Sequence, residues 1–213
     1  MWMISTIISS LTSIFFPTYC YICKKEGLQE QSICESCIAK LKPAIDTPAP
    51  YVSSLFSFKD PAVKKIIHAI KYFHRKDLIA PLALKIAHKI AKKENMATYA
   101  LVPIPMPKFR SYLRGYNHDE ALVFAIAHHT KLSARTDILI RNPLKNKKRQ
   151  VLTKSRSERL NNQHDMFIVH SDLAGMSIIL IDDVATTGAT LSEARRVLLQ
   201  HGAGSVEAFT IAH

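Results

Sequence analysis

Glycine is scarce in this sequence, at six of 213 residues, and there is no internal repeat or low-complexity tract. Repeat arrays are therefore excluded. Neither G-x-x-x-x-G-K-[ST] nor G-x-G-x-x-G occurs, which excludes the two commonest glycine-rich phosphate loops. A phosphate site in this chain would need a different construction.

The sequence also lacks an apolar run long enough to indicate a spanning helix. Residues 1–17 are apolar and uncharged, but the stretch is short and rich in serine. No Lys or Arg precedes it and no small-residue cleavage site follows, so a signal peptide is not favoured. Apolar residues recur at helical spacing from Trp2 to Phe15, which predicts an amphipathic helix packed on the protein or a partner; a membrane role is the alternative. We therefore expect a cytoplasmic protein without stable membrane insertion.

Hydrophobic residues make up 47% of the chain, enough for a core and too many for a disordered protein. The net charge is +12, from 29 Lys and Arg against 17 Asp and Glu. Such a balance favours encounters with polyanions such as nucleic acid or phosphorylated metabolites. A solvated basic surface is the alternative.

All four cysteines lie near the N-terminus, in two C-x2-C pairs separated by ten residues. Two such turns can place four thiolates around one ion, and thiolates favour Zn²⁺. Two disulfides or four inert thiols are the alternatives, but disulfides fit poorly in a cytosolic chain. We predict a closed, structural zinc site whose metal folds the segment. Its ligands would be Cys20, Cys23, Cys34 and Cys37.

Three prolines between residues 42 and 50 indicate a linker, which divides the chain into a cysteine segment (1–41) and a main domain (51–213). Within the main domain, strand and helix patterns alternate, which implies a parallel α/β sheet with flanking helices. Asp60 is the expected N-cap of the first helix and Pro61 its first residue. The expected strands are 51–58, 99–106, 137–140, 166–169, 177–181 and 205–212, and the expected helices are 61–73, 77–93, 119–129 and 190–202.

The strand over residues 177–181, SIILI, is apolar at every position but the first. Such a strand is typical of the middle of a parallel sheet, covered on both faces. Ligands of open α/β sheets bind beyond the carboxyl ends of their strands. Asp182 and Asp183 follow at that end, with side chains that should point apart, and two buried carboxylates need hydroxyl donors or a divalent cation as partners.

The stretch ATTGAT follows the aspartates and leads into a helix at about Thr190. Backbone N–H groups at a helix N-terminus bind phosphate, and Gly188 lets the backbone approach closely. The two carboxylates could bind the hydroxyls of a diol or a metal ion, and the loop beside them could bind a phosphate. Together they predict a site for a ribose 5-phosphate. The alternative is an ordinary strand-to-helix turn, which would explain one Asp and one Thr but not this density of both.

The stretch IILIDDVATTGATL resembles the phosphoribosyl pyrophosphate (PRPP) signature of type I phosphoribosyltransferases. The C-x2-C pairs, IKYFHRKDL, LVPIP, RGYN and the TTGAT loop also occur in the order seen in the competence protein ComF family. This resemblance covers nearly the whole chain. It implies a type I phosphoribosyltransferase-like sheet with an N-terminal zinc knuckle.

The resemblance also implies roles for individual residues. Asp182 and Asp183 would bind the ribose hydroxyls of PRPP, whose pyrophosphate would carry Mg²⁺. His118 stands where the family often has glutamine. The loop that binds PRPP and its 5-phosphate would comprise Ala185, Thr186, Thr187, Gly188, Ala189 and Thr190. The pyrophosphate loop and the flexible hood above it would include Lys71, Pro103, Ile104, Pro105, Arg114, Arg149, Gln150 and Arg156.

Residues 141–160 form a basic segment with eight Lys and Arg and one acid, Glu158. Like charges keep such a segment open until an anion neutralises it. Pyrophosphate or a nucleic-acid backbone could do so. A mobile, solvated loop is the alternative.

Three functional hypotheses follow. The ComF resemblance implies a PRPP-binding protein of natural competence that assists uptake or processing of transforming single-stranded DNA in the cytoplasm, together with proteins of the competence machinery. An active phosphoribosyltransferase of nucleotide metabolism or salvage is the second, although no acceptor signature is present. A partner-binding module that retains PRPP residues without using them is the third.

Overall fold

The computed structural model describes residues 19–26, 32–93, 98–107, 112, 116–143 and 166–213. Within these residues the central sheet has five strands in the order β1-β7-β6-β2-β3, and every neighbouring pair is parallel. The expected parallel α/β sheet is therefore confirmed. Its strands are β1 (Val52–Phe56), β2 (Tyr99–Pro103), β3 (Ser133–Ala134), β6 (Ser177–Val184) and β7 (Ser205–Ala212).

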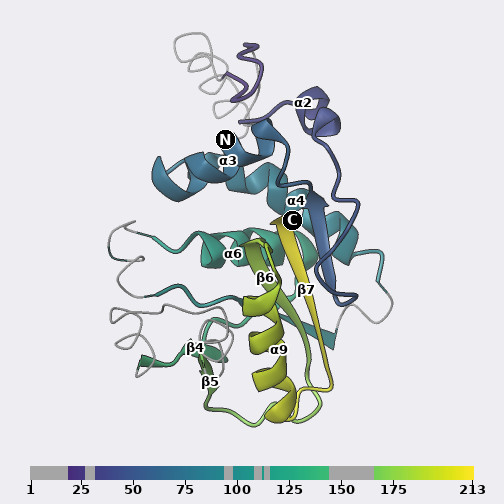
Figure 1. Cartoon of the computed structure of the whole chain (residues 1–213), viewed down its shortest axis with the longest axis vertical. Helices are drawn as coiled ribbons and strands as arrows, with labels where there is room; N and C mark the ends of the chain where they lie inside the picture. The colour runs from purple at the N-terminus through teal and green to yellow at the C-terminus, as the bar shows by residue number, and fades with distance from the viewer. Residues whose placement is uncertain (1–18, 27–31, 94–97, 108–111, 113–115, 144–165) are drawn as a thin grey trace, which may run out of the picture.

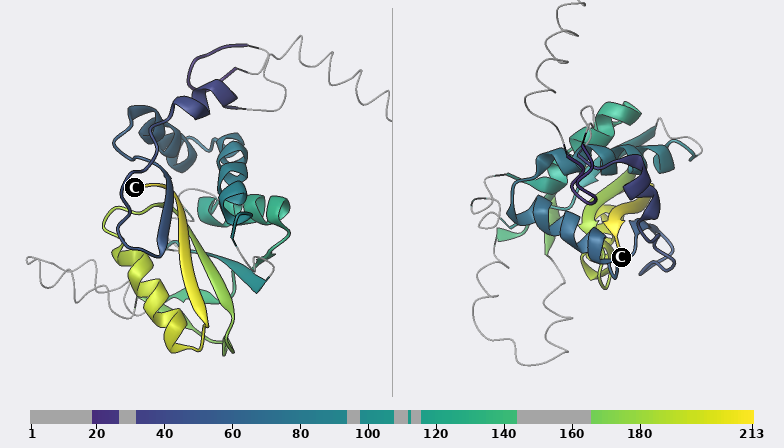
Figure 2. Two further views of the ribbon diagram at one scale, coloured as in Figure 1. Left: turned by 90° about the vertical axis from the view of Figure 1, so that its right-hand side faces the viewer. Right: turned by 90° about the horizontal axis from the view of Figure 1, so that it is seen from above.

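Helices cover both faces of this sheet, with α3, α4 and α6 on one side and α9 on the other (Figures 1 and 2). Two buried clusters of apolar side chains fill the space between the helices and the two sheet faces. The helices are α2 (Glu35–Lys40), α3 (Pro61–Tyr72), α4 (Ile79–Ile90), α6 (His118–Thr130) and α9 (Ala189–Gln200), with a short 3₁₀ turn η1 (Lys76–Leu78) before α4.

Strand β6 lies in the middle of the sheet, between β7 and β2, as its apolar sequence indicates. Its side chains alternate between the two faces. Ile179 and Ile181 belong to the cluster under α3, α4 and α6, whereas Ile178 and Leu180 belong to the cluster under α9. This alternation determines the sides on which the two following aspartates emerge.

Helix α3 begins as the sequence predicts. Asp60 is its N-cap and accepts a 2.8 Å hydrogen bond from the N–H of Ala62, and Pro61 is the first helical residue. The second carboxylate oxygen of Asp60 accepts a 2.9 Å bond from the N–H of Lys42. One side chain therefore caps the helix and holds the segment that arrives from the cysteines.

The expected strands at 137–140 and 166–169 exist, but their parallel pairing in the main sheet is wrong. They form β4 (Leu139–Arg141) and β5 (Phe167–Val169), which pair antiparallel in a separate two-stranded sheet. The chain leaves β4 and returns through β5, so the two strands run in opposite directions. Strand β3 was not expected, because two residues give no periodic pattern.

The cysteine segment packs against the main domain. Ile33, Ile38 and Leu41 lie in the same buried cluster as Ile66 of α3. Pro43 forms a β-bridge with Phe56. The division at residues 41 and 50 stays a prediction, and the expected N-terminal helix lies outside the described residues. In the described part of the chain, no helix is both long enough and apolar enough to cross a bilayer.

Candidate functional site

A pocket of about 160 Å³, which we call the acidic pocket, lies beyond the carboxyl end of β6. Its wall combines carboxylates, cations and a proline-rich turn from five separate parts of the chain. The lining residues are Lys71, Ile104, Pro105, Met106, Pro107, His118, Asp119, Arg141, Asp182, Asp183 and Thr190. The fold thus brings together six residues that sequence reasoning assigned to a PRPP site: Lys71, Ile104, Pro105, Asp182, Asp183 and Thr190.

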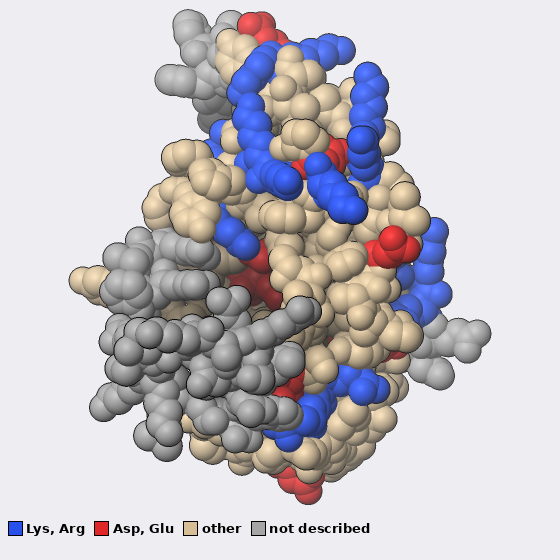
Figure 3. All heavy atoms as spheres, viewed as in Figure 1, with Lys and Arg blue, Asp and Glu red and all other residues tan. Residues whose placement is uncertain are grey.

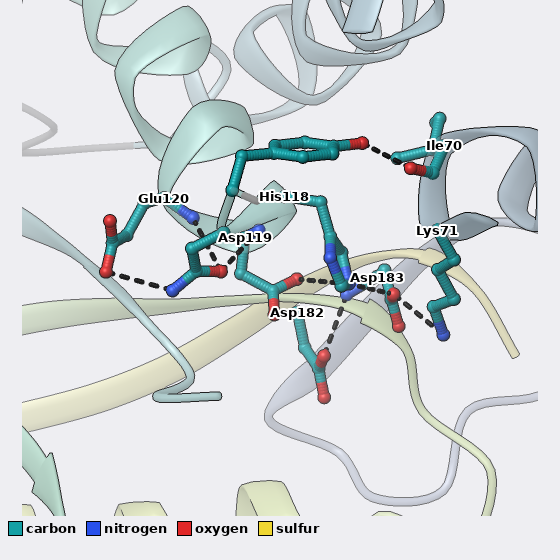
Figure 4. Close-up of polar contacts among 9 residues, drawn as sticks. Ile70, Lys71, His118, Asp119, Glu120, Asp182 and Asp183 are labelled. Carbon is teal, nitrogen blue, oxygen red and sulfur yellow. Dashed lines mark hydrogen bonds and ion pairs between the residues drawn. The ribbon is translucent and has the colours of Figure 1, made fainter. Parts of the chain in front are cut away.

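Asp183 is buried and points toward α3 and α6 (Figure 4). One of its oxygens, Oδ2, accepts a 2.7 Å hydrogen bond from Nε2 of His118 and lies 2.7 Å from Nζ of Lys71. Burial alone would raise the pKa of Asp183, but the hydrogen bond from His118 and the charge of Lys71 outweigh it and lower the pKa. Asp183 is therefore held as a carboxylate by two basic side chains.

Asp182 emerges on the opposite side of the strand and is only half-buried (Figure 4). Its Oδ1 accepts a 2.8 Å bond from the N–H of Asp183. Burial and the neighbouring charge of Asp183 raise the pKa of Asp182 to about 7. Near neutral pH this carboxyl group can therefore both accept and release a proton, and it is the more open of the two to a ligand.

His118 was not assigned a role from the sequence, and its position comes from the start of α6. Asn117 caps that helix through a bond from the N–H of Asp119 to Oδ1 (3.0 Å), and its Nδ2 donates to Glu120 (2.9 Å). Asn117 is therefore a side-chain N-cap, and an asparagine just before an acidic first helical turn is the signal that could have located it. This cap fixes the start of α6, from which Nε2 of His118 reaches Asp183.

Asp119 belongs to the same cluster and was expected only as a helix start. Its Oδ1 lies 3.7 Å from Nε2 of His118. One ligand atom each from His118, Asp119 and Asp183 lie within 4.8 Å of one another, a spacing that could hold a metal ion. Lys71 supplies positive charge to Asp183 in this cluster.

The predicted phosphate loop leads into the N-terminus of α9. Gly188 has a φ of 70° and precedes the helix, and Oγ1 of Thr187 accepts a 3.4 Å bond from the N–H of Ala189. A Cβ at Gly188 would lie 2.9 Å from a side-chain carbon of Pro48, so only glycine fits there without displacement. The linker thus lies directly against the loop.

The remaining predicted residues have other positions. Ala185 and Thr186 line a neighbouring cavity of about 380 Å³ together with His213, and Pro103 is the last residue of β2, paired with Ile181. The structure does not bring these into the acidic pocket. Arg114, Arg149, Gln150 and Arg156 lie outside the described residues.

Arg141 of the basic segment is described, and it lines the acidic pocket from β4. Its Nε donates a 3.3 Å bond to the carbonyl of Pro105. Sequence reasoning counted Arg141 as part of the basic segment without a specific contact. It and Lys71 give the pocket two cationic side chains.

The four cysteines converge in the segment that packs against α3. Their Sγ atoms lie within 4.8 Å of one another, and none forms a disulfide. Sulfurs about 2.3 Å from a central tetrahedral ion would be about 3.8 Å apart, and Cys23 and Cys34 are separated by 3.8 Å. Backbone N–H groups lower the pKa of Cys20 to about 6, against the opposing effect of burial. Four nearby sulfurs with an N–H donor suit a divalent metal.

Comparison with known proteins identifies relatives of this chain. Residues 119–213 match the phosphoribosyl transferase domain. Competence protein ComFC of Bacillus subtilis (strain 168) is 33% identical over 162 residues, which cover 74% of this chain and 62% of that protein. Competence protein F of Haemophilus influenzae is 26% identical to this chain over 113 residues, covering 53% of it and 49% of that protein. The chain therefore has homologues named for competence and carries a phosphoribosyl transferase domain.

A second group of relatives extends along more of this chain. DNA utilization protein YhgH of Salmonella typhimurium is 23% identical over 205 residues, covering 90% of this chain and 88% of that protein. The expected type I phosphoribosyltransferase-like fold with an N-terminal cysteine cluster is thereby confirmed.

Solved structures that overlap this chain include a hypoxanthine phosphoribosyltransferase of Staphylococcus aureus, with 13% identity, a TM-score of 0.40, and coverage of 62% of this chain and 61% of that chain. Glutamine PRPP amidotransferase from B. subtilis overlaps with 15% identity and a TM-score of 0.44, covering 67% of this chain and 30% of that chain. Structural similarity at these TM-scores and identities supports no conclusion about the substrate of this chain.

Proposed function

We propose that this protein is a ComF-type competence protein that binds PRPP with Mg²⁺ in the acidic pocket and, in the cytoplasm, assists the uptake or processing of single-stranded DNA during natural transformation. Two groups of relatives, named for competence and for DNA utilization, support the cellular role. Proteins of the competence machinery are the partners that such a role requires.

The acidic pocket supports the ligand. Asp182 is only half-buried and can accept hydrogen bonds from ribose hydroxyls. Thr190, in the first turn of α9, lines the same pocket. N–H groups at that helix terminus suit the 5-phosphate. The observation that carries the proposal is this meeting of Asp182 and Thr190 in one pocket with two cations, Lys71 and Arg141.

The same pocket suits a magnesium pyrophosphate group. Mg²⁺ prefers carboxylate oxygens and the oxygens of phosphates, and Asp182 and Asp183 supply the former. Bound with PRPP, the ion would neutralise part of the pyrophosphate charge. Lys71 and Arg141 would pair with the rest, and the turn at Ile104 and Pro105 would form the wall beside it.

The four cysteines would hold a structural zinc ion. All four ligands come from the protein, so the site is closed and would contribute stability rather than chemistry. Its burial against α3 links folding of the cysteine segment to that of the main domain.

An active phosphoribosyltransferase with an unknown acceptor is the second candidate. The two pocket cations favour it, because they lie where negative charge would develop on a departing pyrophosphate. The sequence offers no acceptor signature against which a base could be placed. Release of pyrophosphate from PRPP on addition of candidate bases distinguishes the two candidates.

Calorimetric titration with PRPP and Mg²⁺ tests the ligand. We expect micromolar affinity for the natural sequence and loss of binding in Asp182→Asn, which keeps the shape of the side chain and removes its charge. A matched control is Asp172→Asn, which removes an exposed carboxylate from the turn before β6, at the opposite end of that strand from the pocket. Equal affinity in all three proteins would overturn the site assignment.

A further inference from the structure

Tyr21 of the cysteine segment is surrounded by three cations. Nζ of Lys24 lies 5.2 Å from the centre of its ring, Nζ of Lys65 lies 5.5 Å from it, and the guanidinium carbon of Arg75 lies 4.9 Å from it. These charges come from the knuckle, from α3 and from the turn after it, and they repel one another. The ring quadrupole attracts all three and holds them together.

Of the three cations, Arg75 forms an ion pair within the described part of the chain. Arg75 forms a two-bond pair with Asp77 at 2.8 and 2.7 Å, which fixes its guanidinium beside the ring. Lys65 and Lys24 are both exposed. Figure 3 shows Lys and Arg side chains gathered over this upper part of the molecule, where α2 and α3 lie. A fixed group of cations of this kind is complementary to phosphates.

Exposed aromatic rings lie beside the cations, at the end of α3. Tyr72 is 56% exposed and Phe73 is 64% exposed. Both contact the ring of His68, with centroid distances of 4.7 and 5.3 Å. Large aromatic side chains exposed next to a basic cluster are the two components of surfaces that bind single-stranded nucleic acid.

The two components are joined by a groove on the outside of α3. The groove has a volume of about 460 Å³, and its lining includes Lys64, Lys65, His68 and Tyr72. Lys71 lines both this groove and the acidic pocket. The groove therefore reaches from the cation cluster to the edge of the pocket.

We propose that this surface, the α3 face, binds single-stranded DNA, with phosphates on the cations around Tyr21 and bases stacked on the aromatic rings. The proposal rests on the proposed function for the choice of DNA as the polyanion. Single strands are favoured over duplex because a stacked base must expose its face to the ring, which a duplex prevents. The α3 face comprises Tyr21, Lys65, Tyr72, Phe73, Arg75 and Lys76.

The α3 face also contacts the acidic pocket through consecutive side chains. Nζ of Lys76 lies 4.7 Å from the ring centre of Tyr116, and that ring lies 6.4 Å from the ring of His118. His118 in turn donates to Asp183. DNA on this face would therefore lie within one or two side chains of the site proposed for PRPP.

Fluorescence anisotropy with a labelled oligothymidylate of about 20 nucleotides tests the proposal. Lys65→Ala with Lys76→Ala should weaken binding and reduce the salt slope by about 1.4, at about 0.7 for each lost phosphate contact. The matched control is Lys85→Ala with Lys92→Ala on and just after α4, which removes the same charge from exposed positions away from the aromatic rings.

Tyr72→Ala with Phe73→Ala tests stacking separately. We expect affinity to fall by about tenfold or more with little change in salt slope, because no charge is removed. Equal losses in the α3-face and control lysine pairs, or unchanged affinity in the aromatic pair, would overturn the α3 face while leaving the proposed function intact. If the natural sequence binds no oligonucleotide but still binds PRPP, the DNA role fails and this proposal fails with it. If the α3-face variants bind PRPP normally, their DNA loss is specific to this surface.

Discussion

Replacing Asp182 by asparagine should stabilise the folded protein at neutral and alkaline pH. Burial and the charge of Asp183 raise the pKa of Asp182 from 3.8 to about 7. A carboxyl group with a higher pKa in the folded state binds its proton more tightly there than in the unfolded chain. The free energy of unfolding therefore falls as the pH rises between the two values.

The size of this effect follows from the pKa difference. About 3 pH units at 1.36 kcal/mol each correspond to about 4 kcal/mol, which the natural protein loses in full above its folded pKa. Asparagine resembles the protonated acid and can still accept the N–H of Asp183. We expect Asp182→Asn to exceed the natural protein in unfolding free energy by about 4 kcal/mol at pH 8 and by only about 2 kcal/mol at pH 5.

Urea denaturation followed by circular dichroism, at several pH values between about 5 and 8 and with zinc supplied throughout, measures this difference. Asp172→Asn, in the exposed turn before β6, should show no such gain at alkaline pH. A gain that stays constant with pH, or a loss of stability in Asp182→Asn, would refute the reasoning. The expected result also implies that the site is maintained at a cost in stability.

Three further predictions concern other parts of the chain. Cys37→Ser should remove bound zinc, measured by atomic absorption, and loosen the cysteine segment, measured by hydrogen exchange; full zinc content in the variant would contradict the assigned ligands. Lys71→Met should destabilise the protein by about 1–3 kcal/mol at pH 8, because a buried carboxylate loses its 2.7 Å cation, and by less in acid, where that carboxylate is protonated; a loss independent of pH would contradict this. Gly188→Ala should destabilise the fold by about 1–2 kcal/mol because of its positive φ, and further because the new Cβ would clash with Pro48. Gly175→Ala, with a φ of 78° and open space around it, should lose only the stability that the positive φ costs. Equal losses in thermal unfolding would show that the contact between Pro48 and Gly188 is not tight.

Local patterns in the sequence predicted most of the sheet. Strand β6 was recognisable because four consecutive apolar positions favour burial on both faces, and the helix start at Pro61 because Asp60 and proline occupy their usual places. The alternation of β6 also implied that Asp182 and Asp183 point apart, and they do (Figure 4). These features depend on neighbours in the chain, so a single sequence contains them.

The partners of Asp183 could not be predicted in the same way. His118 and Lys71 lie far from it in the sequence and reach it only after α3 and α6 pack on the sheet. The antiparallel pairing of β4 with β5 depends on the path of the intervening chain, which strand periodicity does not contain. The contact between the linker and Gly188 likewise depends on tertiary packing.

The most direct test of the central claim is the calorimetric titration of PRPP and Mg²⁺ into the natural protein and into Asp182→Asn. We expect micromolar binding in the first and none in the second, although the folded variant should be at least as stable as the natural protein at neutral pH. Equal binding in both proteins, or binding in neither, would contradict the assignment of the acidic pocket to PRPP.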